Sequence, residues 1–327
     1  MIDKKYYRLS AKLEAVMDFK ESGYGKGSDC GVSSLEGFFS LKKGFPLFIA
    51  GAPYAGKTEF TLEILINTSK LHGWKHFLYI GEGGDVEAVF SELMSKYIGK
   101  PYDNSKFGMS KDEELKANVF IHNHFVLANH DMEFTIEEFY DLVDEAEKEM
   151  NIKFDTVTFD PFNDVVEELE LYGGREDKYL ASALKKVRVN AKQNNRINIL
   201  VHHIADVRAT TDKDGNRYMP PALPNEWAGG RTWWRRAFTM LLVYRPPQFL
   251  TNDTGEPVEK NESWIFIQKS KPKGVGKLGR VSIYWDWKKN GYYSYDDMNN
   301  QLYSCEKPQK NGLTLDPNIE FESEKPF

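Results

Sequence analysis

The sequence predicts an α/β protein with a mainly parallel central sheet, helices on its faces, and antiparallel strands added at the C-terminal side. Short apolar runs alternate with amphipathic helical patterns over residues 46–204, which is typical of a parallel sheet. A glycine-rich loop at residues 51–58 joins the first run to the first helix. Three more apolar runs follow within residues 239–287 and are separated by turns, which favours antiparallel pairing.

The loop at residues 51–58 has the pattern G-x-x-x-x-G-K-[ST], which is typical of phosphate binding. Its glycines let backbone N–H groups turn inward around phosphate oxygens, where a Cβ atom would collide. The helix after the loop directs the positive end of its dipole toward the same anion. We therefore expect a nucleotide, with the Lys57 ammonium at its β- and γ-phosphates and the Thr58 hydroxyl at a Mg²⁺ ion. The predicted nucleotide-binding residues of the loop are Gly51, Ala52, Pro53, Tyr54, Ala55, Gly56, Lys57 and Thr58.

The other elements are predicted from hydrophobic periodicity and turn signals. The predicted strands are residues 46–50, 75–81, 119–125, 154–160, 197–204, 239–245, 263–270 and 279–287. The predicted helices lie within residues 9–17, directly after the glycine-rich loop, and at residues 85–98, 135–150 and 178–194. Polar segments at residues 99–117 and 205–232 are predicted loops, and the second is too long for a plain connector, which indicates a functional or mobile segment.

This pattern divides the chain into an N-terminal arm at residues 1–30, one core at residues 31–293 and a peripheral or partly disordered tail at residues 294–327. With 327 residues, of which 41% are hydrophobic, the chain can bury one large core. The arm could cover one edge of the core or pack on a neighbouring subunit, and the sequence leaves both alternatives open.

Composition limits the partners and the compartment. No apolar run is long enough to cross a bilayer, and residues 1–16 lack the apolar centre of a signal peptide, so we expect a cytoplasmic protein with no membrane partner. The net charge of −6 and the pI near 5.8 argue against a basic coat, so nucleic acid would be bound by a local patch. Cys30 and Cys305 are far apart and have no companions at metal-ligand spacing, so we expect neither a disulfide nor a zinc site.

Polar side chains are expected to gather at the carboxyl ends of the parallel strands. Gly51, Glu82, Asp160 and His203 each stand at or just after the end of an apolar run. Hydrolysis of a nucleotide needs a carboxylate near Mg²⁺, which we assign to Asp160, and an acid that polarises water, which we assign to Glu82. The strand before Glu82 is expected to neighbour the phosphate-loop strand. Because adjacent strand residues point to opposite faces, His202 and His203 do not predict a metal site, and one of them is expected in the core.

The order of these parts resembles the RecA-like core of DnaB-type hexameric replicative helicases and plasmid RepA-type helicases. The matching segments within residues 31–293 are GVSSLEGFFSLKKG before the phosphate loop, LYIGEGG around Glu82, TVTFDPFND around Asp160 and ILVHHIAD around His203. The resemblance implies that Glu82 is the catalytic glutamate, that Asp160 binds Mg²⁺ and that His203 senses the γ-phosphate of ATP. It also implies a homo-oligomeric ring, a hexamer, that moves on single-stranded DNA and meets other replication proteins.

Two further matches concern the neighbouring subunit and the base. In the family a Lys-x-Arg pair on a late strand reaches the nucleotide of the next subunit, and here residues 268–271 read Gln-Lys-Ser-Lys. The resemblance assigns this role to Lys269 and Lys271, with Lys273 as an alternative to Lys271. Lysine keeps the charge of the family's arginine but lacks its planar fork. Arg245 matches a family residue that stacks on adenine, with an aromatic residue of the last strands as its partner.

The family's DNA-binding loop corresponds here to a segment with basic and aromatic side chains, which can neutralise phosphates and stack on bases. The family's Gly-Ser-Gly segment and following acidic residue are replaced by Gly-Gly-Arg at residues 229–231 and by Phe238. The alternative is a surface helix whose tryptophans pack on the sheet. The predicted DNA-binding residues are Arg208, Arg231, Arg235 and Arg236, in a cluster with Lys213, Arg217, Trp233 and Trp234.

The inferences together predict an ATP-dependent DNA helicase or translocase that hydrolyses ATP between the subunits of a ring. Two other functions stay open. A nucleotide-switched assembly or loader ATPase without unwinding activity is favoured by the acidic net charge and by the lysine at the finger position. A RecA/RadA-like recombination ATPase would share the core but form filaments.

Overall fold

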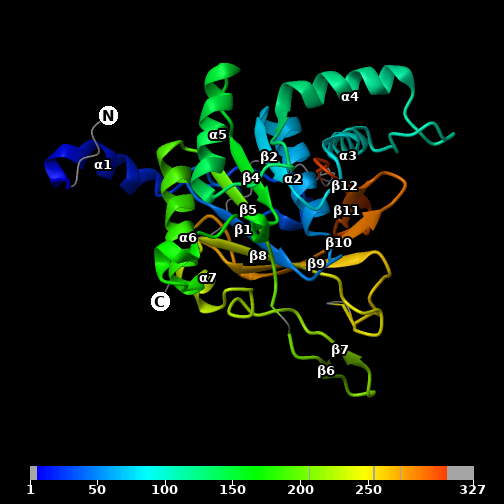
Figure 1. Ribbon diagram of the computed structural model, residues 1–327. Helices are drawn as coiled ribbons and strands as arrows, with labels where there is room; N and C mark the ends of the chain where they lie inside the picture. Colours follow the sequence, from blue (N-terminus) through cyan, green and yellow to red (C-terminus); the bar gives the residue numbers. More distant parts are fainter. Residues whose placement is uncertain (1–5, 206, 253–254, 273, 308–327) are drawn as a thin grey trace, which may run out of the picture.

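The computed structural model describes residues 6–205, 207–252, 255–272 and 274–307, and its centre is a ten-stranded sheet (Figure 1). In order across the sheet the strands are β12 (Gln301–Tyr303), β11 (Gly291–Tyr295), β10 (Gly279–Asp286), β9 (Glu262–Lys269), β8 (Thr239–Tyr244), β1 (Leu47–Gly51), β5 (Ile197–His203), β4 (Thr156–Asp160), β2 (His76–Ile80) and β3 (Phe125–Leu127). The six strands from β8 to β3 are parallel, and β9 to β12 continue the sheet in antiparallel pairs. The predicted fold class is confirmed.

Helices cover both faces of the sheet, with α5 and α6 on one side and α2, α3 and α4 on the other (Figure 1). The helices are α1 (Leu13–Ser22), α2 (Lys57–His72), α3 (Val86–Ile98), α4 (Lys111–His124), α5 (Ile136–Glu149), α6 (Glu176–Gln193) and α7 (Arg231–Arg236). Short 3₁₀ turns are η1 (Leu9–Lys12), η2 (Ser33–Leu35), η3 (Phe162–Asp164) and η4 (Leu169–Tyr172). None of the helices in the described part of the chain is both long and apolar enough to cross a bilayer.

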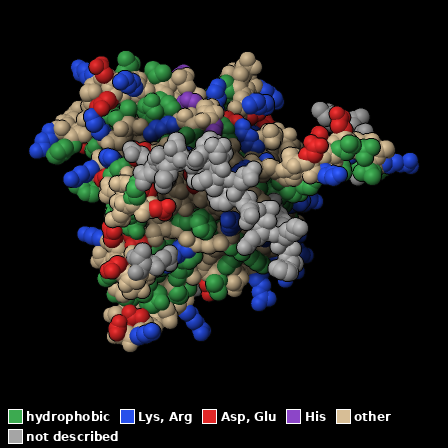
Figure 2. Space-filling model, turned by 180° about the vertical axis from the view of Figure 1, so that it is seen from behind, with side chains coloured by type: hydrophobic (Ala, Val, Ile, Leu, Met, Phe, Trp, Pro, Cys, Tyr) green, Lys and Arg blue, Asp and Glu red, His purple; other side chains and the backbone are tan. Residues whose placement is uncertain are grey.

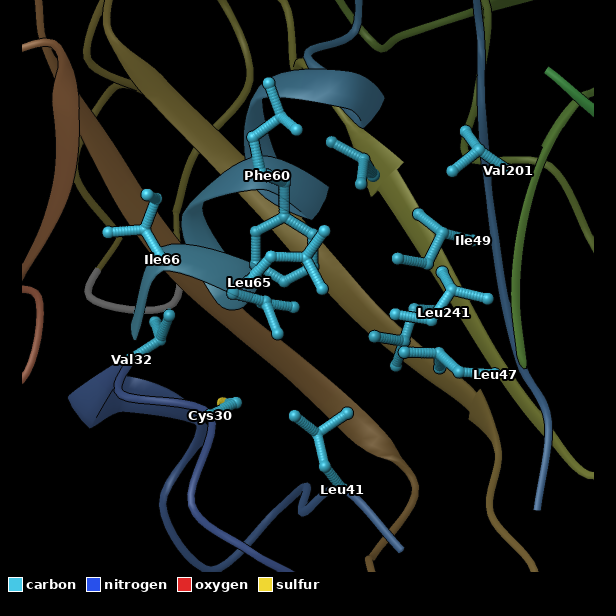
Figure 3. Close-up of a cluster of buried hydrophobic side chains, with 14 of the residues drawn as sticks. Cys30, Val32, Leu41, Leu47, Ile49, Phe60, Leu65, Ile66, Val201 and Leu241 are labelled. Carbon is cyan, nitrogen blue, oxygen red and sulfur yellow. The ribbon is translucent and has the colours of Figure 1, made fainter. Parts of the chain in front are cut away.

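Successive residues of the parallel strands face two separate hydrophobic layers. On β1, Leu47 and Ile49 pack with side chains of α2, α3 and α4, whereas Phe48 packs with side chains of α5, α6 and α7. Figure 3 shows the first layer, in which Ile49 and Leu241 of neighbouring strands lie opposite Phe60 of α2. Burial on both faces explains why these strands read as nearly continuous apolar runs.

One predicted strand is wrong. Residues 119–125 were expected as a strand after a loop at residues 99–117, but α4 occupies Lys111–His124 and only β3 follows it. The helix begins with a capping box, in which the Ser110 hydroxyl accepts from the Glu113 backbone N–H and the Glu113 carboxylate accepts from the Ser110 backbone N–H. Ala117 and Ile121, four residues apart, are its buried side chains, so the apolar residues of this segment follow helical spacing.

The order of the strands corrects a second expectation. β2, the strand before Glu82, pairs with β4 and β3, whereas β1 pairs with β5 and β8. Two strands, β5 and β4, therefore separate the phosphate-loop strand from the strand that ends near Glu82. Both intervening strands end in predicted site residues, so the carboxyl edge of the sheet still gathers the site.

The sheet also continues beyond the predicted start of the tail at residue 294. Ser294 is buried within β11, and its hydroxyl is hydrogen-bonded to the Ser34 hydroxyl at 3.1 Å. β12 then pairs with β11 and buries Leu302. Residues 294–303 therefore belong to the sheet, because a short strand satisfies the free backbone groups of β11. The tail is also predicted to be peripheral or partly disordered, and its residues 308–327 lie outside the described part of the chain.

The N-terminal helix α1 lies apart from the sheet (Figure 1), as a projecting arm that carries hydrophobic side chains (Figure 2). No residue of α1 is buried. Leu13, Val16 and Met17 are 50%, 48% and 61% exposed, although they form the predicted apolar face. Of the two alternatives for the arm, packing along the edge of its own core does not hold for α1, whereas Ser28 forms a bridge with Leu41 and Cys30 is buried in the core.

Candidate active site

The phosphate loop connects β1 to α2 and has the conformation that its glycines require. Gly56 precedes α2 at φ 90°, in the left-handed region where a side chain is strained. A Cβ atom on Gly56 would lie 2.8 Å from the Tyr292 hydroxyl, and one on Gly51 would lie 2.5 Å from the Val243 carbonyl oxygen. The loop therefore depends on glycine for packing as well as for phosphate approach. At its tip, Tyr54 is 96% exposed.

Lys57 begins α2 and lies at the centre of the site. Its ammonium donates to the Ala52 carbonyl oxygen at 3.1 Å and lies 3.4 Å from Nδ1 of His203. Burial lowers the pKa of Lys57, and the charges of Asp160 and Glu82 act in the opposite direction. An ammonium folded back onto its own loop in this way is available to phosphate oxygens that enter the loop.

Thr58 and Asp160 form the candidate metal position. The Thr58 hydroxyl donates to the Asp160 carboxylate at 2.7 Å. Asp160 is buried, and this burial raises its pKa to about 6, although Thr58 and Lys57 lower it. A hydroxyl and a carboxylate beside a phosphate loop suit Mg²⁺, which takes few protein ligands and completes its shell with phosphate and water. The described residues contain no cluster of three or more acidic, histidine or cysteine side chains that could hold a metal ion.

Glu82 and His203 are also brought together, across the ends of β2 and β5. Nε2 of His203 lies 3.2 Å from a Glu82 carboxylate oxygen. Because an ammonium can only donate, the contact with Lys57 makes Nδ1 of His203 the acceptor, and Nε2 then carries the proton that is donated to Glu82. The Glu82 side chain is 61% exposed, so it can reach a water molecule at the mouth of the site. One chain of contacts thus runs from Lys57 through His203 to Glu82.

The sequence did not identify two polar neighbours of this chain of contacts. Asn163 accepts a 3.3 Å hydrogen bond from the backbone N–H of His203. Burial, followed by the charge of Glu82, raises the pKa of Asp164. Both residues lie in η3, directly after β4, and the signal that could have found them is their place in the segment after Asp160.

The histidine pair divides between the two faces of β5, as predicted. His202 is buried, its Nε2 is 2.8 Å from the Ala228 carbonyl oxygen, and its ring centre is 4.6 Å from that of Trp233. Burial lowers the pKa of His202 to about 4, so the ring is neutral at physiological pH. His203 is the residue that faces the site.

The two lysines predicted to act on a neighbour lie at the other end of the sheet. Lys269 pairs with Met240, which pairs with Phe48 near the start of β1. The phosphate loop begins at Gly51, three residues further along β1, or about 10 Å at the rise of a strand. Lys271 is exposed, whereas Lys269 is only 9% exposed. The alternative finger, Lys273, lies outside the described residues.

Arg245 directly follows β8, the strand beside β1 on the side away from β5. The side chain is exposed. Its charge lowers the pKa of Tyr292, whose hydroxyl is next to Gly56, although burial raises that pKa overall. Arg245 is thus on the same edge of the sheet as the phosphate loop, where a base could be bound.

The predicted DNA-binding residues are exposed, but one of the tryptophans beside them is not. Arg231, Arg235 and Arg236 are exposed on α7, and Arg208 is exposed between β5 and the hairpin of β6 (Thr210–Thr211) and β7 (Arg217–Tyr218). This hairpin projects from the body of the protein (Figure 1). Trp233 is 0% exposed, so of the two alternatives for this segment the structure supports, for Trp233, packing on the sheet instead of stacking on bases. It packs against the rings of Phe48, Phe162, His202 and Trp227.

Comparisons with known proteins agree with this architecture. No protein-family model matches the chain. The Twinkle homolog protein, chloroplastic/mitochondrial, of Arabidopsis thaliana is 23% identical over 292 residues, which cover 86% of this chain and 38% of that protein. The chain therefore spans less than two fifths of the length of this curated relative.

Two solved structures share the fold. One is an ATPase domain, which aligns with a TM-score of 0.65 and 15% identity over 88% of this chain and 99% of that one. The other is a DnaB-like replicative helicase, described with its interactions with primase, which aligns with a TM-score of 0.66 and 16% identity over 89% of this chain and 68% of that one. The chain therefore has the fold of the ATPase domains of DnaB-like replicative helicases, as the resemblance in its sequence predicted.

Proposed function

We propose that the protein is an ATP-dependent DNA helicase or translocase, which hydrolyses ATP between the subunits of a ring and moves on single-stranded DNA. The observation that carries this proposal is the convergence of three side-chain contacts at one sheet edge. Thr58 contacts Asp160 at 2.7 Å, and His203 lies between the ammonium of Lys57 and the carboxylate of Glu82. Phosphoryl transfer to water needs this set of groups.

Each residue of the site has a separate role in the proposed hydrolysis of ATP. Lys57 and the backbone N–H groups at the start of α2 bind the β- and γ-phosphates of ATP. Glu82 accepts a hydrogen bond from the attacking water and takes its proton as the water oxygen bonds to the γ-phosphorus and the bond to ADP breaks. His203, in contact with both Lys57 and Glu82, senses the γ-phosphate. Thr58 and Asp160 would hold a Mg²⁺ ion, which would supply positive charge against the phosphates. Arg245 binds the adenine.

The nucleotide-binding site would be completed by a neighbouring subunit. Lys271 is exposed at the end of the sheet opposite the phosphate loop, so its charge is available to a second subunit and not to its own site. The exposed apolar face of α1 gives a second reason to expect assembly, because Leu13, Val16 and Met17 are 50%, 48% and 61% exposed. We propose a homo-oligomeric, hexameric ring in which the helix α1 of the N-terminal arm packs on a neighbouring subunit.

The polynucleotide would be bound by the exposed arginines of α7 and by Arg208. The hairpin next to Arg208 returns to the sheet through the bridge between Ile204 and Trp227, one residue beyond His203. A change at the γ-phosphate could therefore move this segment directly. We extend the proposal to contacts with other replication proteins, since one structural relative is described with its interactions with primase.

The test is ATP turnover by the purified protein with and without single-stranded DNA. We expect a basal turnover that rises with DNA and that is absent in Lys57→Ala. Turnover without any response to DNA would favour the nucleotide-switched assembly ATPase, which the burial of Trp233 supports because it removes one base-stacking side chain. Electron microscopy of the nucleotide-bound protein separates rings from the filaments of a recombination ATPase.

A further inference from the structure

Of the two lysines that the sequence assigns to the neighbouring subunit, Lys269 is already engaged within its own chain. Its ammonium donates to the backbone carbonyl oxygen of Trp234 and lies 4.8 Å from the centre of the Trp234 ring. The side chain is 9% exposed. Release toward another subunit would break a charge-assisted hydrogen bond and a cation–π contact together. Lys271, two residues later, is exposed.

The contact of Lys269 is with the last turn of α7. Carbonyl groups at the end of a helix have no partner within it, and a cation there satisfies them and complements the helix dipole. Trp233 fixes the other side of the same turn, because its indole N–H donates to the Ala228 carbonyl oxygen at 2.6 Å and its ring is buried. Arg235 and Arg236, which follow Trp234, end the helix.

We propose that Lys269 is a positioning residue that holds the last turn of α7 and thereby directs Arg235 and Arg236 toward DNA, and that Lys271 alone supplies the charge to the neighbouring nucleotide. This inference rests on the proposed function for the role of the arginines. The two lysines of one strand end then have separate tasks. Lys269 positions the DNA-binding arginines of its own subunit, and Lys271 acts on the ATP bound to the next subunit.

The first test is hydrogen–deuterium exchange of the backbone around residues 228–240 in Lys269→Met, whose side chain has similar length and no charge. We expect faster exchange there than in the wild-type protein. The matched control is Lys106→Met, because Lys106 also lies 4.8 Å from the centre of a ring, that of Phe107, in an exposed loop. Unchanged exchange in Lys269→Met would overturn the anchoring, and this result does not depend on whether the protein binds DNA.

The second test separates the two lysines by activity. Lys269→Met should keep basal ATP turnover and weaken binding of single-stranded DNA, with a salt slope smaller by up to about 1.4, the value for two lost phosphate contacts. It should have little further effect in an Arg235→Ala/Arg236→Ala background, since those arginines are what it positions. Independent effects on DNA affinity would overturn the proposal.

Basal ATP turnover of Lys269→Met distinguishes this positioning role from a role of Lys269 at the nucleotide of the neighbouring subunit. If Lys269→Met lowered basal turnover and regained it when mixed with Lys57→Ala, Lys269 would be acting on the neighbour and the proposal would be wrong. A failure of the proposed function looks different. In that case the wild-type protein would show no DNA binding for the arginines to contribute, while the exchange experiment would still report on Lys269.

Discussion

The hydroxyl of Thr58 donates a 2.7 Å hydrogen bond to the carboxylate of Asp160, which lies 102 residues later in the chain. This contact joins the start of α2 to the end of β4. The Asp160 carboxyl is buried, and its pKa of about 6 is above its ordinary value of 3.8. At neutral pH the protein therefore keeps an ionised carboxylate in a buried place, which is unfavourable until a cation binds.

Replacing this carboxylate should change how stability depends on pH. A carboxyl whose pKa is raised by folding binds its proton more tightly in the native state, so the free energy of unfolding falls as the pH rises from about 4 to about 6. Asp160→Asn cannot ionise and should lack this loss, which is at most about 3 kcal/mol at about 1.4 kcal/mol per pKa unit. Without nucleotide and Mg²⁺, its melting temperature should exceed that of the wild-type protein at pH 8 and match it near pH 4. A difference that is the same at both pH values would contradict the burial of an ionised Asp160.

The same variant should lose function. Asp160→Asn removes an oxygen charge next to the Mg²⁺ position, so ATP turnover should fall and its dependence on Mg²⁺ concentration should weaken. Turnover measured across a Mg²⁺ titration tests this expectation. Asp112→Asn, at an exposed residue of α4, is a matched control and should titrate as the wild-type protein does. Wild-type Mg²⁺ dependence in Asp160→Asn would remove Asp160 from the metal site.

Lys57→Ala should abolish nucleotide binding or turnover and leave the fold intact. The substitution removes a charge-assisted contact with phosphate and little core volume. Nucleotide binding, ATP turnover and circular dichroism measure the two parts of the prediction. Lys70→Ala, an exposed lysine near the other end of α2, is the control for loss of a lysine from this helix and should behave as wild type. Hydrolysis at the wild-type rate in Lys57→Ala would refute the assignment of the phosphate loop.

Glu82→Gln should bind ATP normally and turn it over about 10²- to 10⁴-fold more slowly, since it keeps the shape of the side chain but cannot take a proton from water. The amide can still accept the hydrogen bond from His203, so the local geometry should persist. Single-turnover kinetics with a separate measurement of ATP affinity test this. Glu87→Gln, an exposed residue in the first turn of α3, provides the control. If Glu82→Gln were as fast as wild type, another group would have to act as the base.

Lys271→Ala should be inactive alone and regain activity when mixed with Lys57→Ala. In a mixed ring, an intact phosphate loop on a Lys271→Ala subunit can meet an intact Lys271 on its neighbour. The control is Lys57→Ala mixed with the double variant Lys57→Ala/Lys271→Ala, where no subunit retains Lys57 and no site can be complete. Absence of rescue in the first mixture would mean that Lys271 acts in its own subunit or not at all.

Replacing Arg231, Arg235 and Arg236 together by alanine should lower affinity for single-stranded DNA and retain basal ATP turnover and ring formation. With fewer phosphate contacts fewer counterions are released, so the salt slope should become smaller by up to about 2. Binding titrations at several salt concentrations measure this slope. Arg188→Ala, exposed on α6, should bind DNA as the wild-type protein does. Unchanged binding in the triple variant would make these arginines structural and favour the assembly ATPase.

Some differences between expectation and structure have specific local causes. The apolar pattern of residues 119–125 predicts a strand, but a short apolar run fits both a strand and a helix. A signal against that assignment was present nearby, since Ser110 and Glu113 have the spacing of a capping box. Trp233 gave no such signal. Whether an aromatic residue of a polar segment is buried depends on whether that segment packs back onto the sheet. Here the Trp233 ring packs on the ring of Phe48, which is far away in the sequence.

The sequence by itself determined the elements whose cause is local. The loop before Lys57 follows from its glycines, the two-sided burial of the strands follows from their apolar runs, and the two faces of β5 follow from the alternation of His202 and His203. These depend on spacings of a few residues. They were enough to predict the fold class and the residues at the carboxyl edge.

Only the tertiary structure decided which of these residues meet. The strand order puts β5 and β4 between β1 and β2, and hydrophobic periodicity does not contain that order. It also decided that Lys269 is bound to Trp234 while Lys271 is exposed, although both are lysines at the end of one strand. The physical reason is that contacts between distant segments depend on how the sheet is assembled and packed, whereas the sequence pattern reports only the face and the end of each strand on which a residue lies.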